Sequence, residues 1–259
     1  MQSESSGWRT RELVAYLHST KGSAVCIIDP FKLADVEVLE RAEMAEALGS
    51  PFIILASTDH PNFTERMTSL VPRVSSAVSV PTLLHFPPTR GEGLPVVQGA
   101  TGYLWPALLM SWDPYFVWES LLESAARWPT ILAGATPPEP ILCAALTVGP
   151  DSQSESILKT HSLEENRQAV HETARMVRML GLDMIYLYSR NQRVSPKTCA
   201  MFRGEILPNQ LIFVSGNMRS GKDVVQYLHA GADFVGFAGA CEGPDWRERM
   251  LDFFNTRSV

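Results

Sequence analysis

The sequence lacks three features that would place the protein in a membrane, in a secretory pathway or on a nucleic acid. It contains no run of about 18 apolar residues, the length a transmembrane helix needs. Residues 1–12 have no apolar core of a signal peptide. Lys and Arg form no cluster and the formal net charge is −6, whereas a groove for a phosphate backbone needs concentrated positive charge. We therefore expect a cytoplasmic protein that binds no nucleic acid.

Cysteine is also scarce. Cys26, Cys143, Cys199 and Cys241 lie far apart in the chain and have no metal-type spacing, so we expect buried free thiols. Hydrophobic residues, by contrast, make up 45% of the 259 residues, which is enough for a large core. This length is usual for one barrel of eight strands and eight helices.

The segment 211–241 has the pattern of a strand–turn–helix–strand unit. Apolar runs at 211–214 and 234–237 are separated by a helical spacing of apolar residues within 220–229. Such a unit places its two strands in parallel.

The turns after these two strands are candidates for a phosphate site. Ser215, Gly216 and Asn217 follow the first strand, and Ala238 and Gly239 follow the second. Short side chains let main-chain N–H groups approach an anion beside a helix N-terminus, and the last two strands of an eight-stranded barrel commonly bind phosphate there. The alternative is that the glycines serve only as turn and helix-cap residues.

The rest of the chain repeats the strand-then-helix pattern. We predict further strands at 24–28, 52–56, 80–84, 103–109, 141–146 and 184–187, with 130–133 as the alternative for the fifth. We predict helices at 37–48, 64–78, 115–127, 166–180 and 246–254, and an exposed loop at 151–165. An additional helix at 8–18 precedes the first strand and could close the lower end of the barrel.

This repeat, which no linker interrupts, indicates a single domain over 1–259 of the (β/α)8 class, with a doubly wound sheet as the alternative. Residues 86–95 hold too many prolines and glycines for the helix expected after the third strand. One outer helix is therefore predicted to be missing.

The sequence resembles the geranylgeranylglyceryl phosphate synthase family, which includes bacterial heptaprenylglyceryl phosphate synthases and the moenomycin-type phosphoglycerate prenyltransferase. The resemblance spans nearly the whole chain and rests on residues 28–32, 52–58, 185–187, 215–220 and 231–233. It implies a modified TIM barrel without its third outer helix, with an aliphatic groove in that space. It also implies a Mg²⁺-dependent enzyme that transfers an isoprenyl chain from a prenyl diphosphate to a hydroxyl of a phosphorylated three-carbon acceptor.

The resemblance assigns the donor diphosphate and its Mg²⁺ to Asp29 and Thr58. The assignment suits the ion, because Mg²⁺ usually binds through one or two carboxylates together with substrate phosphates. Lys32 would neutralise phosphate charge, and Asp59 is a candidate for an extra carboxylate. The alternative for Asp29 is a helix cap.

For the acceptor, Tyr186 matches a family tyrosine, whereas the family glutamate two positions later is Tyr188 here. A tyrosine carries no repelling charge, and Arg190 and Arg193 add positive charge just beyond it. This exchange suits an acceptor with a carboxylate, so 3-phosphoglycerate is favoured over glycerol-1-phosphate. The alternative is that both arginines are solvated loop residues.

Tyr103, Trp105 and Leu108, on the predicted strand 103–109, are candidates for contacts with the prenyl chain. Aromatic faces can stabilise a carbon that becomes cationic, although core packing is the alternative for each of them.

The general base is left open among Glu139, His85 and Asp59. Two other functions also stay open: a sugar-phosphate isomerase or lyase with Asp29 and Asp59 as acid and base, and a non-catalytic barrel that binds phosphate or prenyl chains. The second arises because the family's glycine-rich turns are altered here. The sequence fixes neither the donor chain length nor the oligomeric state, and a homodimer is possible.

Overall fold

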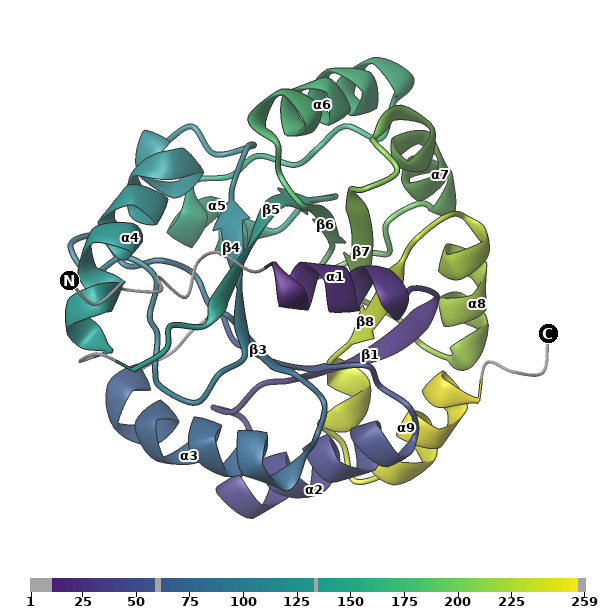
Figure 1. Cartoon of the computed structure of the whole chain (residues 1–259). Helices are drawn as coiled ribbons and strands as arrows, with labels where there is room; N and C mark the ends of the chain where they lie inside the picture. The colour runs from purple at the N-terminus through teal and green to yellow at the C-terminus, as the bar shows by residue number, and fades with distance from the viewer. Residues whose placement is uncertain (1–10, 59–61, 133–134, 256–259) are drawn as a thin grey trace.

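The structure, a computed structural model, describes residues 11–58, 62–132 and 135–255. Eight parallel strands close into a barrel in chain order, with β1 paired to β8 (Figure 1). The strands are β1 Ser23–Ile28, β2 Ile53–Ala56, β3 Thr82–His85, β4 Gly102–Ala107, β5 Glu139–Thr147, β6 Met184–Tyr188, β7 Leu211–Ser215 and β8 Phe234–Phe237. The predicted (β/α)8 class is confirmed, and the doubly wound alternative is wrong.

Helices surround this barrel (Figure 1). They are α1 Glu12–Ser19, α2 Asp35–Ala47, α3 Phe63–Ala77, η1 Tyr115–Glu119, α4 Ser120–Ile131, α5 Ser152–Leu158, α6 Arg167–Leu180, α7 Pro196–Glu205, α8 Gly221–His229, η2 Gly239–Cys241 and α9 Trp246–Phe254. The fifth strand lies where we favoured it, and the alternative at 130–133 is wrong because Thr130 and Ile131 end α4. Residues 8–10 of the predicted first helix and residue 133 lie outside the described residues.

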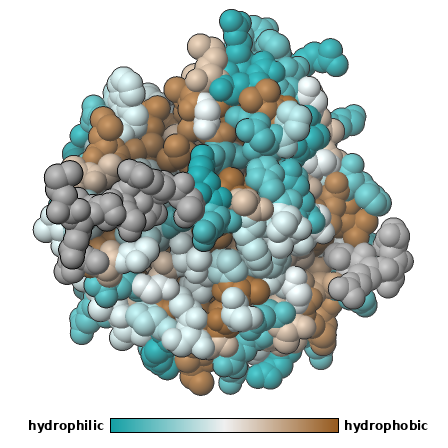
Figure 2. All heavy atoms as spheres, in the orientation of Figure 1, coloured by the Kyte–Doolittle hydropathy of each residue, from teal (hydrophilic) through white to brown (hydrophobic). Residues whose placement is uncertain are grey.

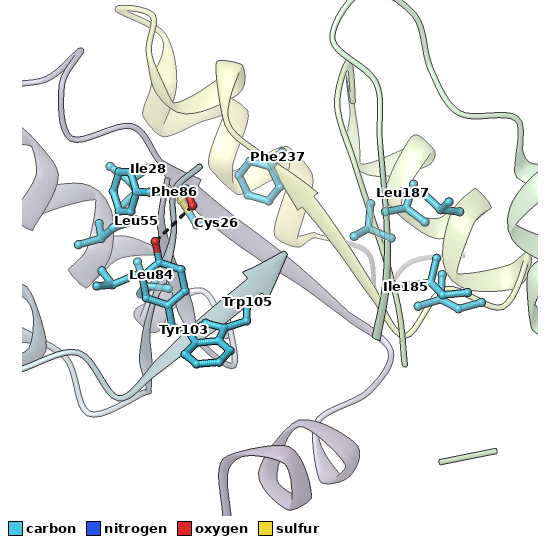
Figure 3. Close-up of a cluster of buried hydrophobic side chains, with 14 of the residues drawn as sticks. Cys26, Ile28, Leu55, Leu84, Phe86, Tyr103, Trp105, Ile185, Leu187 and Phe237 are labelled. Carbon is cyan, nitrogen blue, oxygen red and sulfur yellow. Dashed lines mark hydrogen bonds between the residues drawn. The ribbon is translucent and has the colours of Figure 1, made fainter. Parts of the chain in front are cut away.

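The core has two layers because every strand is buried on both faces. In β1, Val25 and Ile27 pack inside the barrel, whereas Cys26 and Ile28 pack against the surrounding helices. Figure 3 shows part of this outer layer. Burial on both faces explains why the strands read as continuous apolar runs rather than as alternating patterns.

Helix α1 closes the N-terminal end of the barrel, as predicted. The main-chain N–H groups of Leu13 and Val14 donate to the carboxylate of Glu139 over 3.0 and 3.3 Å, and Leu17 is buried in the inner core. A Cβ on Gly102 would lie 2.2 Å from Leu13 Cδ2, so a larger residue there would force the Leu13 side chain to move. Figure 1 shows α1 lying across the barrel end, and Figure 2 shows side chains covering that end. Ligands must therefore enter from the opposite end.

No helix lies between β3 and β4, a connection that the structure describes in full, so the predicted loss of an outer helix is confirmed. Phe86, Leu94 and Val96 from this connection are buried in the outer core together with Trp128 of α4. Trp128 Nε1 donates to the Leu94 carbonyl over 3.3 Å. The irregular segment thus fills part of the space that a helix would occupy.

Residues 159–165 form no helix, as predicted for an exposed loop at 151–165, but the first part of that segment contradicts the prediction. Helix α5 forms there, and Asp151 and Ser154 are each 1% exposed. Asp151 caps the helix: its carboxylate accepts hydrogen bonds from the Ser154 N–H over 3.2 Å and the Ser154 hydroxyl over 2.7 Å. Leu158, the last residue of α5, packs into the inner core.

None of the helices in the described part of the chain combines the length and the apolar character needed to cross a bilayer.

Candidate functional site

The carboxyl ends of the strands line one cavity of about 870 Å³, a size typical of small-ligand sites. Residues that follow β1 and β2 lie on its wall together with the turns that follow β7 and β8. The sequence-predicted residues that line it are Asp29, Lys32, Thr58, Leu108, Tyr186, Tyr188, Arg190, Ser215, Gly216, Asn217, Ala238 and Gly239. Most of the predicted donor and acceptor residues therefore line one cavity.

Asp29 lies at the end of β1, in a network of hydrogen bonds. Its Oδ1 accepts from the Phe31 N–H over 3.0 Å and its Oδ2 from the Ser57 hydroxyl over 3.1 Å. Burial raises the pKa of Asp29, and these hydrogen bonds together with Lys32 counteract the rise. Lys32 Nζ lies 3.7 Å from Asp29 Oδ2 and donates to both carboxylate oxygens of Glu242 over 3.0 and 3.1 Å.

The donor atoms on this wall fit Mg²⁺. Among the described residues no three His, Cys, Asp or Glu side chains form a complete metal cage. Mg²⁺ does not need one, because it binds through one or two carboxylates and completes its shell with substrate phosphates and water. The Asp29 and Glu242 carboxylates and the Thr58 hydroxyl supply hard oxygen donors to the cavity. Asp59, the other predicted carboxylate, lies outside the described residues.

The turn after β7 is fixed against the loop after β6. Gly216 has φ +98°, and a Cβ there would lie 1.8 Å from the Ser189 carbonyl oxygen, so only glycine fits. Asn217 also has positive φ, and its Nδ2 donates to the Arg190 and Gln192 carbonyls over 2.7 and 3.3 Å. The side-chain amide of Asn217 is therefore occupied by the loop that follows β6. An anion at this turn would therefore accept hydrogen bonds from main-chain N–H groups.

The turn after β8 is open where Gly239 lines the cavity, since a Cβ on Gly239 would meet no atom within 4 Å. At the start of α8, by contrast, the Asp223 carboxylate accepts from the main-chain N–H groups of Arg219 and Ser220 over 2.7 and 3.3 Å. Asp223 also pairs with Arg193. An anion in the cavity must therefore rely on the turns rather than on the main-chain N–H groups of Arg219 and Ser220, which precede α8.

The same ion pair explains why Arg193, a predicted acceptor residue, does not line the cavity. Its guanidinium group instead donates to the Asp223 carboxylate, which also accepts from the main-chain N–H of Ser220, the N-cap of α8.

Two tyrosines of β6 face the cavity. The Tyr186 hydroxyl lies 2.7 Å from Ser215 Oγ, and burial raises the pKa of Tyr186. The Tyr188 hydroxyl accepts from Thr147 Oγ1 over 2.7 Å and lies 3.2 Å from Ser154 Oγ. Burial raises the pKa of Tyr188 as well. Both phenols are thus neutral hydrogen-bonding groups at physiological pH.

Arg190 connects two walls of the cavity. Its guanidinium group donates to Thr58 Oγ1 over 2.8 Å and to Gln153 Oε1, and its Nε lies 3.4 Å from Asp151 Oδ1. The side chain is 40% exposed, so it retains access to a ligand. It is the predicted arginine that the structure does bring to the site.

The apolar wall of the cavity lies beside β3 and β4. Leu108 belongs to it, with Phe86, Pro87, Pro88 and Leu158. Tyr103 and Trp105 do not: strand alternation places them in the outer core, where their rings lie 5.4 and 4.8 Å from that of Trp128. The Tyr103 hydroxyl donates to the Phe86 carbonyl over 3.2 Å (Figure 3).

Of the three candidates for the general base, His85 alone is placed in the cavity by the structure. Glu139 lies at the opposite end of the barrel, where it binds α1, and Asp59 lies outside the described residues.

Sequence reasoning missed several lining residues: Gln153, Ser154, Met218, Arg219, Glu242 and Arg249. Arg219 and Glu242 follow the two phosphate turns by a few residues, so extending each predicted turn would have found them. Gln153 and Ser154 follow Asp151, a residue type that favours a helix N-cap and that could have indicated α5. Arg249 comes from the last helix and gives no signal in the sequence.

Comparison with known proteins agrees with this fold. A geranylgeranylglyceryl phosphate synthase from Thermoplasma acidophilum, solved with its substrate sn-glycerol-1-phosphate, superposes with a TM-score of 0.81 at 17% identity, over 95% of this chain and 96% of that one. Wild-type GGGPS from Thermoplasma volcanium gives 0.80 at 19% identity over the same shares. Orotidine 5'-phosphate decarboxylase from Pyrococcus horikoshii gives 0.59 at 11%, over 90% of this chain and 100% of that one.

The comparison with curated proteins gave no match. The model of the PcrB family, however, matches residues 18–256, which is nearly the whole chain. The family resemblance predicted from the sequence is therefore confirmed, and the chain belongs to the PcrB family.

Proposed function

We propose that the protein is a Mg²⁺-dependent prenyltransferase that moves an isoprenyl chain from a prenyl diphosphate to a hydroxyl of a phosphorylated three-carbon acceptor. The observation that carries this proposal is the shared cavity, which Asp29 and Lys32 line together with the turns at Gly216 and Gly239. Membership of the PcrB family and the fold of the two synthases support the same reaction class. One of those synthases binds sn-glycerol-1-phosphate, an acceptor of this kind.

Each wall of the cavity would then have one task. Lys32 stabilises negative charge on the departing diphosphate, and Asp29 with Thr58 would hold the Mg²⁺ that neutralises the rest of that charge. The turns at Gly216 and Gly239 bind the acceptor phosphate and so fix the position of its hydroxyl. The apolar wall at Leu108 receives the first part of the prenyl chain and excludes water from the reacting carbon.

We further propose that the acceptor is 3-phosphoglycerate rather than glycerol-1-phosphate. Although the whole chain is acidic, four cationic side chains line the cavity, Lys32, Arg190, Arg219 and Arg249, against two acidic ones. Arg190 lies between the donor wall at Thr58 and the acceptor wall at β6, where a carboxylate on the acceptor would meet it. A planar guanidinium group suits a carboxylate through paired hydrogen bonds.

The test supplies farnesyl and longer prenyl diphosphates with either acceptor, in Mg²⁺ or in EDTA, and identifies the product by mass. We expect a prenyl ether of 3-phosphoglycerate that forms only with the metal. Arg190→Gln should lower kcat/KM more for 3-phosphoglycerate than for glycerol-1-phosphate. Preferred turnover of glycerol-1-phosphate would reject the acceptor assignment. Binding of both substrates without product in any pairing would reject prenyl transfer and leave a non-catalytic barrel.

A further inference from the structure

The reaction proposed above releases a proton from the acceptor hydroxyl, and the cavity must provide a group to take it. Resting on that proposed function, we propose that His85 is this general base, through its Nε2 atom. His85 ends β3 and lines the cavity. None of the segments that carry the family resemblance includes His85.

His85 lies beside the residues that would hold the acceptor. Its ring meets the ring of Tyr186 edge to face, with centroids 5.1 Å apart. The Tyr186 hydroxyl in turn lies 2.7 Å from Ser215 Oγ, in the first phosphate turn. A row of side chains therefore crosses the cavity from β3 through β6 to β7. With its phosphate placed at Ser215 by the proposed function, the acceptor would extend its short carbon chain along this row toward His85.

The tautomer of His85 is fixed by its neighbour on β4. His85 Nδ1 lies 3.3 Å from the Leu104 carbonyl oxygen. A carbonyl oxygen can only accept, so Nδ1 carries the proton and donates it in this hydrogen bond. Nε2 then has a lone pair, and none of the hydrogen bonds among the described residues uses it. The ring thus offers a basic atom in the cavity.

The charge state of His85 agrees with this role. Burial lowers the pKa of His85 to about 4, so the ring is neutral at physiological pH. The other ionisable side chains that line the cavity in the described part of the chain are Asp29, Lys32, Tyr186, Tyr188, Arg190, Arg219, Glu242 and Arg249. The arrival of two polyanionic substrates favours the protonated ring and raises the pKa of His85 in the complex.

The proton transfer balances without another reactant. The bond between C1 of the donor and the diphosphate oxygen breaks, and its electron pair leaves with the diphosphate. A lone pair of the acceptor hydroxyl forms the new C–O bond, and the hydroxyl proton moves to Nε2. Because the attacking oxygen becomes positively charged as that bond forms, its proton is strongly acidic, and a weakly basic imidazole is sufficient. The imidazolium then releases its proton to water or to the departing diphosphate.

The test compares His85→Gln with the wild-type protein. Glutamine keeps an N–H that can donate to the Leu104 carbonyl but has no basic lone pair, so kcat should fall by about 10²- to 10⁴-fold. The KM values of donor and acceptor should change by less than about threefold. The acid limb of the kcat–pH profile should lose the part that protonation of His85 contributes and keep the part that protonation of Asp29 contributes. His161→Gln is the matched control, because His161 is exposed and does not line the cavity. His85→Ala should regain activity when imidazole is added.

Wild-type kcat in His85→Gln, or an unchanged pH profile, would overturn the assignment of His85 and leave prenyl transfer intact. A wild-type protein that forms no prenyl ether with any substrate pair would overturn the proposed function itself. Thermal unfolding shows whether each variant folds. If neither variant folds, the wild-type profile decides: a kcat that stays constant from about pH 8 to about pH 4 contradicts proton uptake by His85.

Discussion

Replacing Asp29 by asparagine should separate its role in catalysis from its role in stability. If the carboxylate holds Mg²⁺ on the donor diphosphate, the substitution removes one electrostatic contact to the developing charge. Loss of one such contact typically costs about 10²- to 10³-fold in kcat. We expect a loss of this size in Asp29→Asn, together with a need for more Mg²⁺ to reach half-maximal rate.

The stability of the fold should change much less than the rate in Asp29→Asn. The carboxylate of Asp29 accepts two hydrogen bonds, from Phe31 and Ser57, and the single carbonyl oxygen of asparagine would keep one. One lost hydrogen bond costs about 0.5–1.5 kcal/mol. Against this, removal of a partly buried charge relieves the desolvation that raises the pKa of Asp29. The two effects have opposite signs, so the free energy of unfolding should change by less than about 1 kcal/mol.

The raised pKa of Asp29 also determines how the stability difference between Asp29→Asn and wild type changes with pH. A carboxyl group whose pKa is raised by folding disfavours the folded state at pH values above its unfolded pKa, and this cost vanishes at lower pH, where both states are protonated. The stability of Asp29→Asn relative to wild type should therefore rise from about pH 3 to pH 7. Urea unfolding at several pH values measures this difference.

Glu40→Gln provides the matched control, since Glu40 pairs with Arg247 on the surface and does not line the cavity. We expect wild-type kcat and a stability change within about 1 kcal/mol for this control. The reasoning is refuted if Asp29→Asn keeps wild-type kcat and Mg²⁺ dependence. It is also refuted if the variant unfolds so easily that lost activity merely follows lost structure.

Three further substitutions test individual walls of the cavity. Gly216→Ala places a Cβ 1.8 Å from the Ser189 carbonyl oxygen, so we expect a loss of about 1–3 kcal/mol in urea unfolding and at least a tenfold rise in acceptor KM. Tyr188→Phe removes a hydrogen bond to Thr147 and should cost about 1 kcal/mol in thermal unfolding while acceptor choice, measured as a ratio of kcat/KM values, stays unchanged. Leu108→Trp should shorten the longest donor accepted in a chain-length series and spare the shortest.

The barrel could be predicted from sequence because its signal is local. Each strand is buried on both faces, so β1 and β6 read as short apolar runs, and polar residues follow them at the carboxyl end. The prolines and glycines after β3 likewise predicted a missing helix. Chain order then placed the ends of β1, β2, β7 and β8 at one mouth, which is why most of the predicted site residues line the cavity.

What failed depends on contacts between distant segments. The polarity of 151–165 indicated a loop, but Asp151 and Ser154 are polar and buried. The Ser154 hydroxyl donates to the Asp151 carboxylate and lies within hydrogen-bond distance of the Tyr188 hydroxyl. Similarly, Arg193 looked free beside Arg190 in the sequence, and only its pairing with Asp223 of α8 removes it from the cavity. Neither partner can be chosen from local spacing.

The structure changes the interpretation of Tyr188, which stands where the family resemblance implies a glutamate. The Tyr188 hydroxyl is not free to bind the acceptor, because it already accepts a hydrogen bond from Thr147 and lies within hydrogen-bond distance of Ser154. What the exchange changes is charge: no carboxylate at this position competes for Arg190, which is left with Thr58, Gln153 and a 3.4 Å contact to Asp151. Arg190 already pairs with the Asp151 carboxylate, so a glutamate at position 188 would add a second negative charge beside the guanidinium group, whereas a tyrosine adds none. If the acceptor carries a carboxylate, as proposed, its selection should depend on Arg190, and Tyr188 should contribute by carrying no charge.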